Sequence, residues 1–253
     1  MRRTEREALA LGLLHGPVEL VPVSSSGHVA AVPWLLGWEV ARWDGERRKE
    51  LEVALHAGTA LALLIVARPA RLRPALLAAA VLPPALAGLA LERRIEQRLG
   101  TPVTLAAGLL AGGLALVLAD RVEPTRSAEE ARARDGAWVG LAQAAALIPG
   151  VSRSGATLAA ARWLGFSRAD ASRLSWEVAL PVLLGATGLK ASRVTPTSRG
   201  TVPLYVGAGA AFASTLATAG AIGIERRAPL WPWAAWRAGL AAAILAVRQN
   251  RGR

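Results

Sequence analysis

The sequence contains no cysteine, and its 253 residues include only two phenylalanines and one tyrosine. The absence of cysteine excludes disulfide bonds and thiolate metal sites. Hydrophobic residues nevertheless make up 53% of the chain, so its apolar mass consists mainly of alanine, leucine and valine. This composition argues against an ordinary soluble domain.

Acidic residues are also scarce, with 18 against 30 basic residues and a formal net charge of +12. The charges gather in short polar blocks between apolar runs, at 41–50, 68–73, 92–98 and 120–135. Such blocks are typical of the loops and headgroup-facing helix ends of a polytopic membrane protein. An RNA-binding protein would instead interleave basic and aromatic residues on amphipathic faces. We therefore expect a lipid bilayer as partner and no nucleic acid.

The apolar runs predict an all-α polytopic membrane protein, because a spanning helix needs about 20 mostly apolar residues. Six runs are candidates for spanning helices: 51–67, 74–91, 102–119, 174–189, 201–224 and 229–247. Two further regions, 8–40 and 137–166, are each broken by a polar centre, which also makes the first unlike a cleavable signal peptide. Broken segments at membrane depth are tolerated only where they are buried in protein or line a wet cavity. We therefore expect two re-entrant hairpins beside the six spans, and a functional site at the breaks.

The two broken regions resemble each other. Val23-Ser-Ser-Ser-Gly27 recurs 128 residues later as Val151-Ser-Arg-Ser-Gly155, and a glycine follows each copy at the same spacing. Upstream, Gly12-Leu13 matches Gly140-Leu141 at the same offset. These matches predict an internal duplication. We expect one integral-membrane domain built of two repeats, about 8–119 and 137–247, joined by a polar loop at 120–136.

The first break, VPVSSSGH, carries a cluster of polar side chains between apolar stretches. Ser24, Ser25 and Ser26 precede His28, while His15 and Glu19 stand four residues apart and share one face of a helix. Ionisable groups at membrane depth are costly and usually face the bundle interior or an aqueous pocket. The cluster therefore favours a functional site over a structural one.

The second break, PGVSRSGAT, contains Arg153, the only charge between residues 137 and 161. Small residues around it let backbone N–H groups converge on an anion, and a following helix would add its positive end. Arginine supplies a planar fork of donors that suits phosphate. Ser152, Ser154 and Thr157 can add hydroxyl donors. This break predicts a phosphate cradle.

Together the two breaks predict phosphoryl chemistry beside lipid. A serine hydroxyl is a weak nucleophile until a base removes its proton, and a carboxylate can orient that base or hold a cation. The spacing alone does not identify the substrate. A polyprenyl-phosphate transporter or flippase is the alternative, because broken helices and a polar site at the midplane suit it as well.

At these motifs the sequence resembles the undecaprenyl-diphosphate phosphatases of bacteria, the bacitracin-resistance family. The matching segments are ELVPVSSSGH (19–28), EVALHAGTALAL (52–63), GLAQAAALIPGVSRSGAT (140–157), ASRLSWEVALPVLLGA (171–186) and PWAAWRAGL (232–240). The resemblance implies an enzyme that hydrolyses C55 polyprenyl diphosphate to the monophosphate carrier and inorganic phosphate, for cell-wall synthesis. It also implies six spanning helices and two re-entrant hairpins in an inverted repeat. The implied location is the cytoplasmic membrane, with the site toward its outer face; bacitracin would compete for the substrate, and a homodimer is left open.

The resemblance further assigns the site. It implies Glu19, Ser25, His28 and Arg153 as catalytic residues. Ser25 is the expected nucleophile, His28 its base or proton shuttle, and Glu19 an orienting group or cation ligand, although attack by histidine or water stays open. Arg153 would stabilise the transferring phosphoryl group. The expected phosphate-binding residues are Ser24, Ser26, Ser152, Ser154 and Thr157.

Two positions depart from the family pattern. An acidic residue or glutamine usually stands four positions before the conserved glutamate, where this chain has His15. The expected metal ligands are Glu19 and His15, and the implied ion is Mg²⁺ or Ca²⁺; a histidine lowers the negative charge that this ion would meet. Glu177 stands where the family has an apolar residue, and we expect a structural role at a helix entry with Lys190 or Arg237 as partner.

Overall fold

The computed structural model describes residues 1–66, 72–193 and 200–251. Within these ranges the chain forms ten α-helices, four short 3₁₀ turns and no strand, which confirms the all-α prediction. The α-helices are α1 (Arg3–Leu20), α2 (Ser25–Leu36), α3 (Gly45–Val66), α4 (Pro74–Leu99), α5 (Pro102–Asp120), α6 (Ala133–Ala145), α7 (Arg153–Trp163), α8 (Arg168–Arg193), α9 (Val202–Thr218) and α10 (Trp231–Arg251). Residue 67 of the first predicted span and most of the polar block at 68–73 lie outside the described residues.

Three segments in the described ranges are long and apolar enough to cross a membrane: Pro74–Leu91, Pro102–Asp120 and Val202–Arg226. They agree with the runs expected at 74–91, 102–119 and 201–224. The remaining three runs fall in α3, α8 and α10, which carry several charged residues each. The number of spans therefore stays a prediction.

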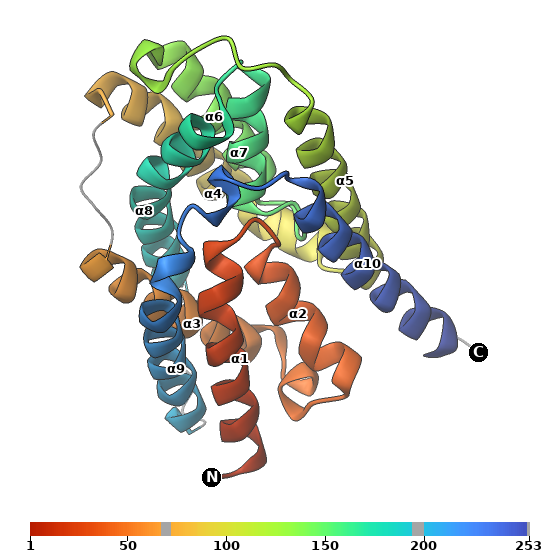
Figure 1. Ribbon diagram of the computed structural model, residues 1–253. Helices are drawn as coiled ribbons and strands as arrows, with labels where there is room; N and C mark the ends of the chain where they lie inside the picture. Colours follow the sequence, from red (N-terminus) through yellow and green to blue (C-terminus); the bar gives the residue numbers. More distant parts are fainter. Residues whose placement is uncertain (67–71, 194–199, 252–253) are drawn as a thin grey trace.

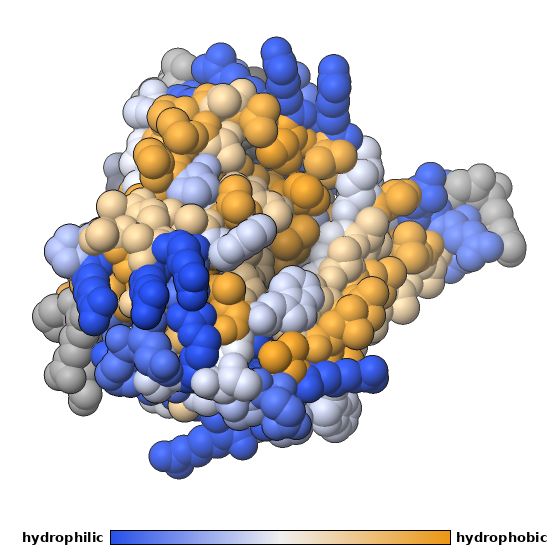
Figure 2. Space-filling view, turned by 90° about the horizontal axis from the view of Figure 1, so that it is seen from above, coloured by the Kyte–Doolittle hydropathy of each residue, from blue (hydrophilic) through white to orange (hydrophobic). Residues whose placement is uncertain are grey.

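Large apolar side chains reach the surface of these helices. On α4 the exposed leucines include Leu82, Leu86 and Leu89. On α5 they recur at the same helical spacing, including Leu110 and Leu114. Figure 2 shows apolar side chains over much of one face, with the hydrophilic ones gathered in groups. Exposed apolar stripes of this size fit contact with lipid rather than with water.

The helices pack in matched pairs. α1 lies beside α9, and α6 lies beside α4 (Figure 1). Likewise α3 contacts α9 while α8 contacts α4, and α5 packs along α10. In the two predicted repeats α1 corresponds to α6, α3 to α8, α4 to α9 and α5 to α10. When the repeats are exchanged, the pair α1–α9 becomes α6–α4 and the pair α3–α9 becomes α8–α4, and both members of each exchange are observed. The proposed repeat boundaries stay a prediction, and this exchange is the packing that a duplicated chain would produce.

Gly12 and Gly140 show why the matched pairs pack closely. A Cβ atom on Gly12 would lie 2.6 Å from Ala210 Cβ and 2.9 Å from Ala211 N, both on α9. On Gly140 it would lie 2.8 Å from the carbonyl oxygens of Ala79 and Ala80 on α4. All of these distances are too short for a side chain, so each glycine allows two helix backbones to approach closely.

Each broken region folds as two helices joined by a turn. In the first, α1 ends at Leu20 and α2 begins at Ser25. In the second, α6 ends at Ala145 and α7 begins at Arg153. The predicted breaks are confirmed, and their re-entrant insertion into a bilayer stays a prediction.

Candidate active site

The two turns share an unusual backbone at one matched position. Ser24 has φ 75° and Ser152 has φ 69°, and they are the only non-glycine residues with positive φ in the described ranges. Each serine caps the helix that follows: Ser24 Oγ accepts from Gly27 N at 3.2 Å, and Ser152 Oγ accepts from Gly155 N at 3.3 Å. A left-handed serine costs about 1–3 kcal/mol and survives where the surrounding structure enforces it, most often at functional sites.

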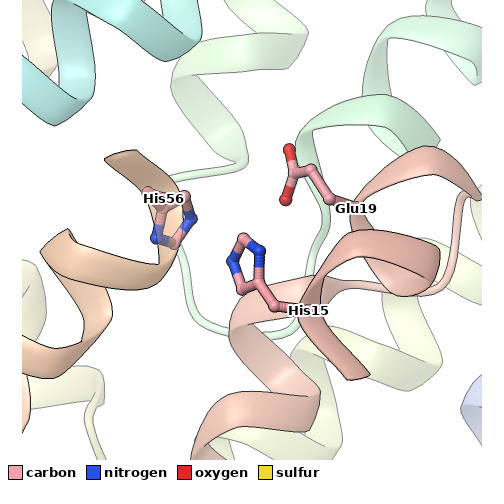
Figure 3. Close-up of side chains that lie close together, drawn as sticks. All are labelled: His15, Glu19 and His56. Carbon is pink, nitrogen blue, oxygen red and sulfur yellow. The ribbon is translucent and has the colours of Figure 1, made fainter. Parts of the chain in front are cut away.

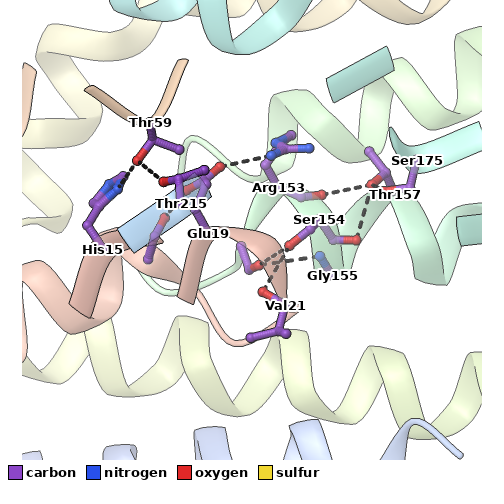
Figure 4. A network of polar contacts seen from close by, with 12 residues as sticks. His15, Glu19, Val21, Thr59, Arg153, Ser154, Gly155, Thr157, Ser175 and Thr215 are labelled. Carbon is purple, nitrogen blue, oxygen red and sulfur yellow. Dashed lines mark hydrogen bonds and ion pairs between the residues drawn. The ribbon is translucent and has the colours of Figure 1, made fainter. Parts of the chain in front are cut away.

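The turns bring two helix N-termini together. Ser154 Oγ, near the start of α7, donates at 3.5 Å to the carbonyl of Val21, the residue that follows α1 (Figure 4). Unpaired N–H groups and the helix dipole make such N-termini favourable places for anions. Two of them at one point provide a cradle for a group with several negative oxygens, such as a diphosphate.

Glu19 connects the two turns. It is buried, with 7% of its surface exposed, and its Oε1 accepts from Arg153 NH2 at 2.8 Å (Figure 4). Its other oxygen, Oε2, accepts from the Ser25 hydroxyl in a short hydrogen bond. The structure therefore joins three of the four predicted catalytic residues, from both broken regions. In this arrangement the Ser25 hydroxyl donates its hydrogen bond to the carboxylate and not to an imidazole.

His28 lies on α2 but is held by other partners. Its Nδ1 is 2.7 Å from the Ser24 carbonyl oxygen, and Trp236 Nε1–H donates to its Nε2 at 2.8 Å. Because a carbonyl oxygen only accepts, Nδ1 carries the proton and Nε2 is the acceptor. Both ring nitrogens are thus engaged away from Ser25. The base role of His28 stays a prediction, while its contact with Ser24 holds the left-handed turn in place.

The predicted phosphate-binding hydroxyls gather around the helix starts. Ser24 Oγ lies 3.5 Å from Ser26 Oγ, and Ser152 Oγ lies 3.3 Å from Ser154 Oγ. Thr157 differs, because its fully buried hydroxyl donates to the Arg153 carbonyl at 3.0 Å and contacts Ser175 Oγ on α8 at 2.6 Å. Thr157 therefore connects the start of α7 to α8 through its hydroxyl.

Arg237 contacts both turns, and sequence reasoning did not assign it to the site. Its side chain is fully buried in α10. Nε donates to the Pro22 carbonyl at 2.8 Å, and NH1 donates to the Val151 carbonyl at 3.2 Å. One guanidinium therefore binds both turns. The lone charge in the apolar motif PWAAWRAGL is the signal that could have found it.

The expected partners of Glu177 are wrong. Arg173, one turn earlier on α8, donates to Glu177 at 2.9 Å, whereas Lys190 binds Glu52 on α3 at 2.8 Å. Neither glutamate stands at a helix entry, since Glu52 lies inside α3 and Glu177 inside α8. Arg173 stands four residues before Glu177 in the sequence. On one helix such a spacing brings opposite charges together, so Glu177 needs no partner from another helix.

A second cluster lies on the opposite side of Glu19. His15, Glu19 and His56 each offer a ligand atom within 4.8 Å of the other two, and the two imidazole centroids are 4.6 Å apart (Figure 3). His15 Nδ1 contacts Thr59 Oγ1 at 2.8 Å, and His56 Nδ1 donates to the Glu52 carbonyl at 2.8 Å. The predicted pair His15 and Glu19 is therefore brought together. His56 was missed, although it stands in the matching motif EVALHAGT.

An apolar cavity of about 240 Å³ adjoins the first turn. Its wall includes Val21 and Val23 of the turn itself and Trp233 and Trp236 of α10. The same Trp236 binds His28. Apolar space thus begins next to the polar cradle, as a ligand with a charged head and an apolar tail requires.

Comparison with known proteins places this geometry in context. Residues 8–243 match the family described as "Bacitracin resistance protein BacA". The chain is 36% identical to the undecaprenyl-diphosphatase of Geobacter sulfurreducens, over 94% of this chain and 96% of that protein. It is 32% identical to the undecaprenyl-diphosphatase of Pelotomaculum thermopropionicum, over 97% of this chain and 98% of that protein.

Proposed function

Because the chain belongs to the bacitracin resistance protein BacA family, we propose that it is an undecaprenyl-diphosphatase of the bacterial cytoplasmic membrane. It hydrolyses the C55 diphosphate to the monophosphate lipid carrier and inorganic phosphate, which returns the carrier to cell-wall synthesis. The observation that carries the proposal is the contact of Glu19 with both Ser25 and Arg153 across the two turns.

The cradle binds the diphosphate. The N-terminal amides of α2 and α7 and the serine hydroxyls around them face the phosphate oxygens, and Arg153 supplies the compensating charge. In the described part of the chain the Arg153 guanidinium has only one hydrogen bond, through NH2 to Glu19. Its remaining donors are therefore available to a phosphoryl group. The isoprenoid tail leaves the cradle through the apolar cavity beside Trp236.

Ser25 is the nucleophile in this proposal. Its Oγ attacks the terminal phosphorus while Glu19 takes the hydroxyl proton, and the bond from that phosphorus to the bridging oxygen breaks. The bridging oxygen leaves with the lipid monophosphate, and Arg153 stabilises the charge on the transferring group. After Glu19 has released its proton to solvent, water attacks the phosphoserine and gives a proton to Glu19, and the bond from phosphorus to Ser25 Oγ breaks. Glu19 passes this proton to the leaving Ser25 oxygen, which restores the hydroxyl, and inorganic phosphate departs.

The wider setting follows the family. We propose six spanning helices and two re-entrant hairpins, with the two turns toward the outer face of the membrane, where bacitracin would compete for the lipid. The three apolar segments and the exposed leucine stripes support insertion in lipid.

The metal implied by the family was Mg²⁺ or Ca²⁺, and the residues at Glu19 fit it poorly. These hard cations take oxygen ligands, six to eight in the case of Ca²⁺. The cluster offers one carboxylate, which already accepts hydrogen bonds from Ser25 and Arg153, and two imidazoles. No step of the mechanism above is therefore assigned to a metal.

Release of phosphate from C55 diphosphate by the purified protein in detergent tests the proposal. We expect Ser25→Ala and Arg153→Ala to lower turnover by at least about 100-fold, the scale of losing a nucleophile or a charge-stabilising group. Ser192→Ala, an exposed serine on α8, is the matched control and should keep full turnover.

The outcomes separate the parts of the proposal. Near-normal turnover in Ser25→Ala would remove Ser25 as nucleophile and leave the enzyme assignment standing. Translocation of a labelled polyprenyl phosphate without any phosphate release would replace the hydrolase by the transporter.

A further inference from the structure

We infer that His15, Glu19 and His56 together bind one divalent transition-metal ion, of the Zn²⁺, Mn²⁺ or Co²⁺ kind, instead of Mg²⁺ or Ca²⁺. The role of the ion in turnover rests on the proposed function, since Glu19 belongs to both sites. Its binding does not, and can be measured without substrate.

The donor chemistry selects this class of ion. Two imidazoles and one carboxylate are ligands of zinc and of other first-row transition metals, and three such protein ligands leave a position open. Cysteine is absent from the chain, so no thiolate competes for the ion. His15 decides the selectivity, because an acidic residue at this position would give the oxygen-rich site that hard cations prefer.

The cluster has the geometry of a site ready to close on an ion. Ligand atoms of the three residues lie within 4.8 Å of one another; His15 and Glu19 of α1 are buried, and His56 of α3 is half-buried. Two nitrogens bound to one tetrahedral zinc lie about 3.3 Å apart, given bond lengths of about 2.0–2.1 Å. Side-chain shifts of roughly an ångström would complete the coordination.

An unpaired nitrogen points to a missing ligand. His15 has no exposed surface, and its Nε2 has no hydrogen-bond partner in the described part of the chain. A buried polar atom without a partner costs about 1–3 kcal/mol. A metal ion at this nitrogen would remove that cost.

The other ring nitrogens are already fixed. His56 Nδ1 donates to the Glu52 carbonyl, so its Nε2 carries the lone pair. His15 Nδ1 contacts Thr59 Oγ1, and the Thr215 hydroxyl of α9 contacts the same oxygen at 3.2 Å. Metal-binding histidines almost always have such an outer partner on the second nitrogen, which sets the ring orientation.

Glu19 can serve both sites at once. Its two oxygens accept from Ser25 and Arg153, and a carboxylate has about four lone-pair positions. Figure 3 shows the carboxylate facing the two imidazoles. An ion there would fix the orientation of Glu19 beneath Ser25 and add positive charge next to the diphosphate.

Binding is tested on untagged protein, stripped with a chelator and kept in detergent. Elemental analysis after incubation with Zn²⁺, and the visible absorption of added Co²⁺, measure occupancy without activity. We expect one ion per chain, retained in excess Mg²⁺. His56→Ala should lose the ion and the Co²⁺ absorption, and Thr59→Val should weaken binding by about 10–100-fold, as loss of an outer partner does. His28→Gln, which changes the histidine outside the cluster, should bind as wild type.

His15→Glu provides the sharpest comparison. It should lose the Co²⁺ absorption typical of nitrogen ligands and gain affinity for Mg²⁺ or Ca²⁺. The inference is overturned if wild type takes up no Zn²⁺ or Co²⁺, or if His56→Ala binds them equally well. In that case the cluster is a metal-free group of hydrogen-bonding side chains. Phosphate release without ion binding would sink this inference alone, whereas ion binding without phosphate release would sink the proposed function alone.

Discussion

At the scale of single residues, the site depends on which group accepts the proton of Ser25. The hydroxyl donates to Glu19, and both nitrogens of His28 are engaged elsewhere. The same carboxylate accepts from Arg153, which holds it in one orientation, and in the proposed mechanism this favours proton transfer from Ser25. In this structure His28 contacts the backbone of the turn through the Ser24 carbonyl and has no contact with the Ser25 hydroxyl.

His28→Asn separates these two roles. The asparagine amide can still donate to the Ser24 carbonyl, as Nδ1–H does, but it cannot act as a base. We expect the kcat of His28→Asn to be lower than that of wild type by no more than about tenfold. His28→Ala lacks the donor, so its kcat should be lower still and it should unfold at a lower temperature. Phosphate release and thermal unfolding in detergent measure both. Equal inactivity of the two variants, with wild-type stability, would restore the histidine base.

Ser24 tests the strain in the turns. Ser24→Gly loses the cap at a cost of a few tenths of a kcal/mol but removes the penalty of positive φ, so we expect wild-type stability or slightly more. Ser24→Ala keeps the strain and loses the cap, which costs about 1 kcal/mol, or about 2–4 °C in unfolding midpoint. Thermal unfolding of both variants, and of the matched pair at Ser152, checks the order. A glycine variant less stable than the alanine variant would contradict it.

The motifs made the residue types predictable, but not their pairing. SSSGH and SRSG located the polar turns, because polar groups inside apolar runs are rare. Ser25 pairs with Glu19 and not with His28, because His28 Nδ1 is bound to the Ser24 carbonyl. The positive φ angle of Ser24 helps to position that carbonyl. No spacing in the sequence encodes that φ angle, since serine seldom adopts it.

At the scale of elements, helix contacts depend on the smallest side chains. Gly12→Ala would raise intrinsic helix propensity by about 1 kcal/mol, yet the new Cβ has no room against α9. We expect net destabilisation of about 1–3 kcal/mol, as for other overpacked sites. Gly209→Ala is the control. Gly209 lies on α9, the helix that Gly12 contacts, and a Cβ atom on it would have no other atom within 4 Å. Equal thermal unfolding midpoints for the two variants would refute the close contact.

Hydropathy predicted the helices better than their role in the membrane. The runs at 74–91 and 102–119 are long, apolar and nearly free of charge, so their segments coincide with α4 and α5. In α3 the run at 51–67 continues a charged stretch that begins at Gly45, and buried pairs such as Arg47 with Glu50, at 2.6 Å, neutralise it. Pairing of this kind is a tertiary effect that hydropathy does not capture.

At the scale of the whole molecule, the polar loop at 120–136 joins the two predicted repeats, and Asp135 holds this loop to the start of α6. Arg126 donates to both oxygens of this carboxylate, at 3.0 and 2.8 Å, and Arg132 N donates at 2.8 Å. Burial raises the pKa of Asp135, but these hydrogen bonds outweigh it and hold the pKa below the usual range. The carboxylate therefore stabilises the fold above the ordinary aspartate pKa of about 3.9, and this contribution is lost as the pH falls through the lower folded value.

Asp135→Asn should abolish that dependence. We expect the variant to be less stable than wild type near neutral pH, and the difference to shrink as the pH falls below about 4. Thermal unfolding between about pH 7 and pH 3 measures it, with exposed Glu123→Gln as control. A constant gap between wild type and Asp135→Asn across that range would contradict the assignment.

Arg237 couples the two halves at the site itself. Its fork binds Pro22 in one turn and Val151 in the other, so the separation of Ser25 from Arg153 is set by one buried side chain of α10.

Lysine keeps the charge but is a point donor that cannot reproduce this planar fork. A misplacement near 1 Å costs about 100-fold in rate. We therefore expect Arg237→Lys to lower kcat by about 10–100-fold with a smaller change in KM, because no group that contacts the lipid is removed. Arg248→Lys, exposed on the same helix, should leave both constants unchanged. A rise in KM alone would mean that Arg237 contributes to substrate binding, and unchanged kinetics would mean that the turns stay in place without it.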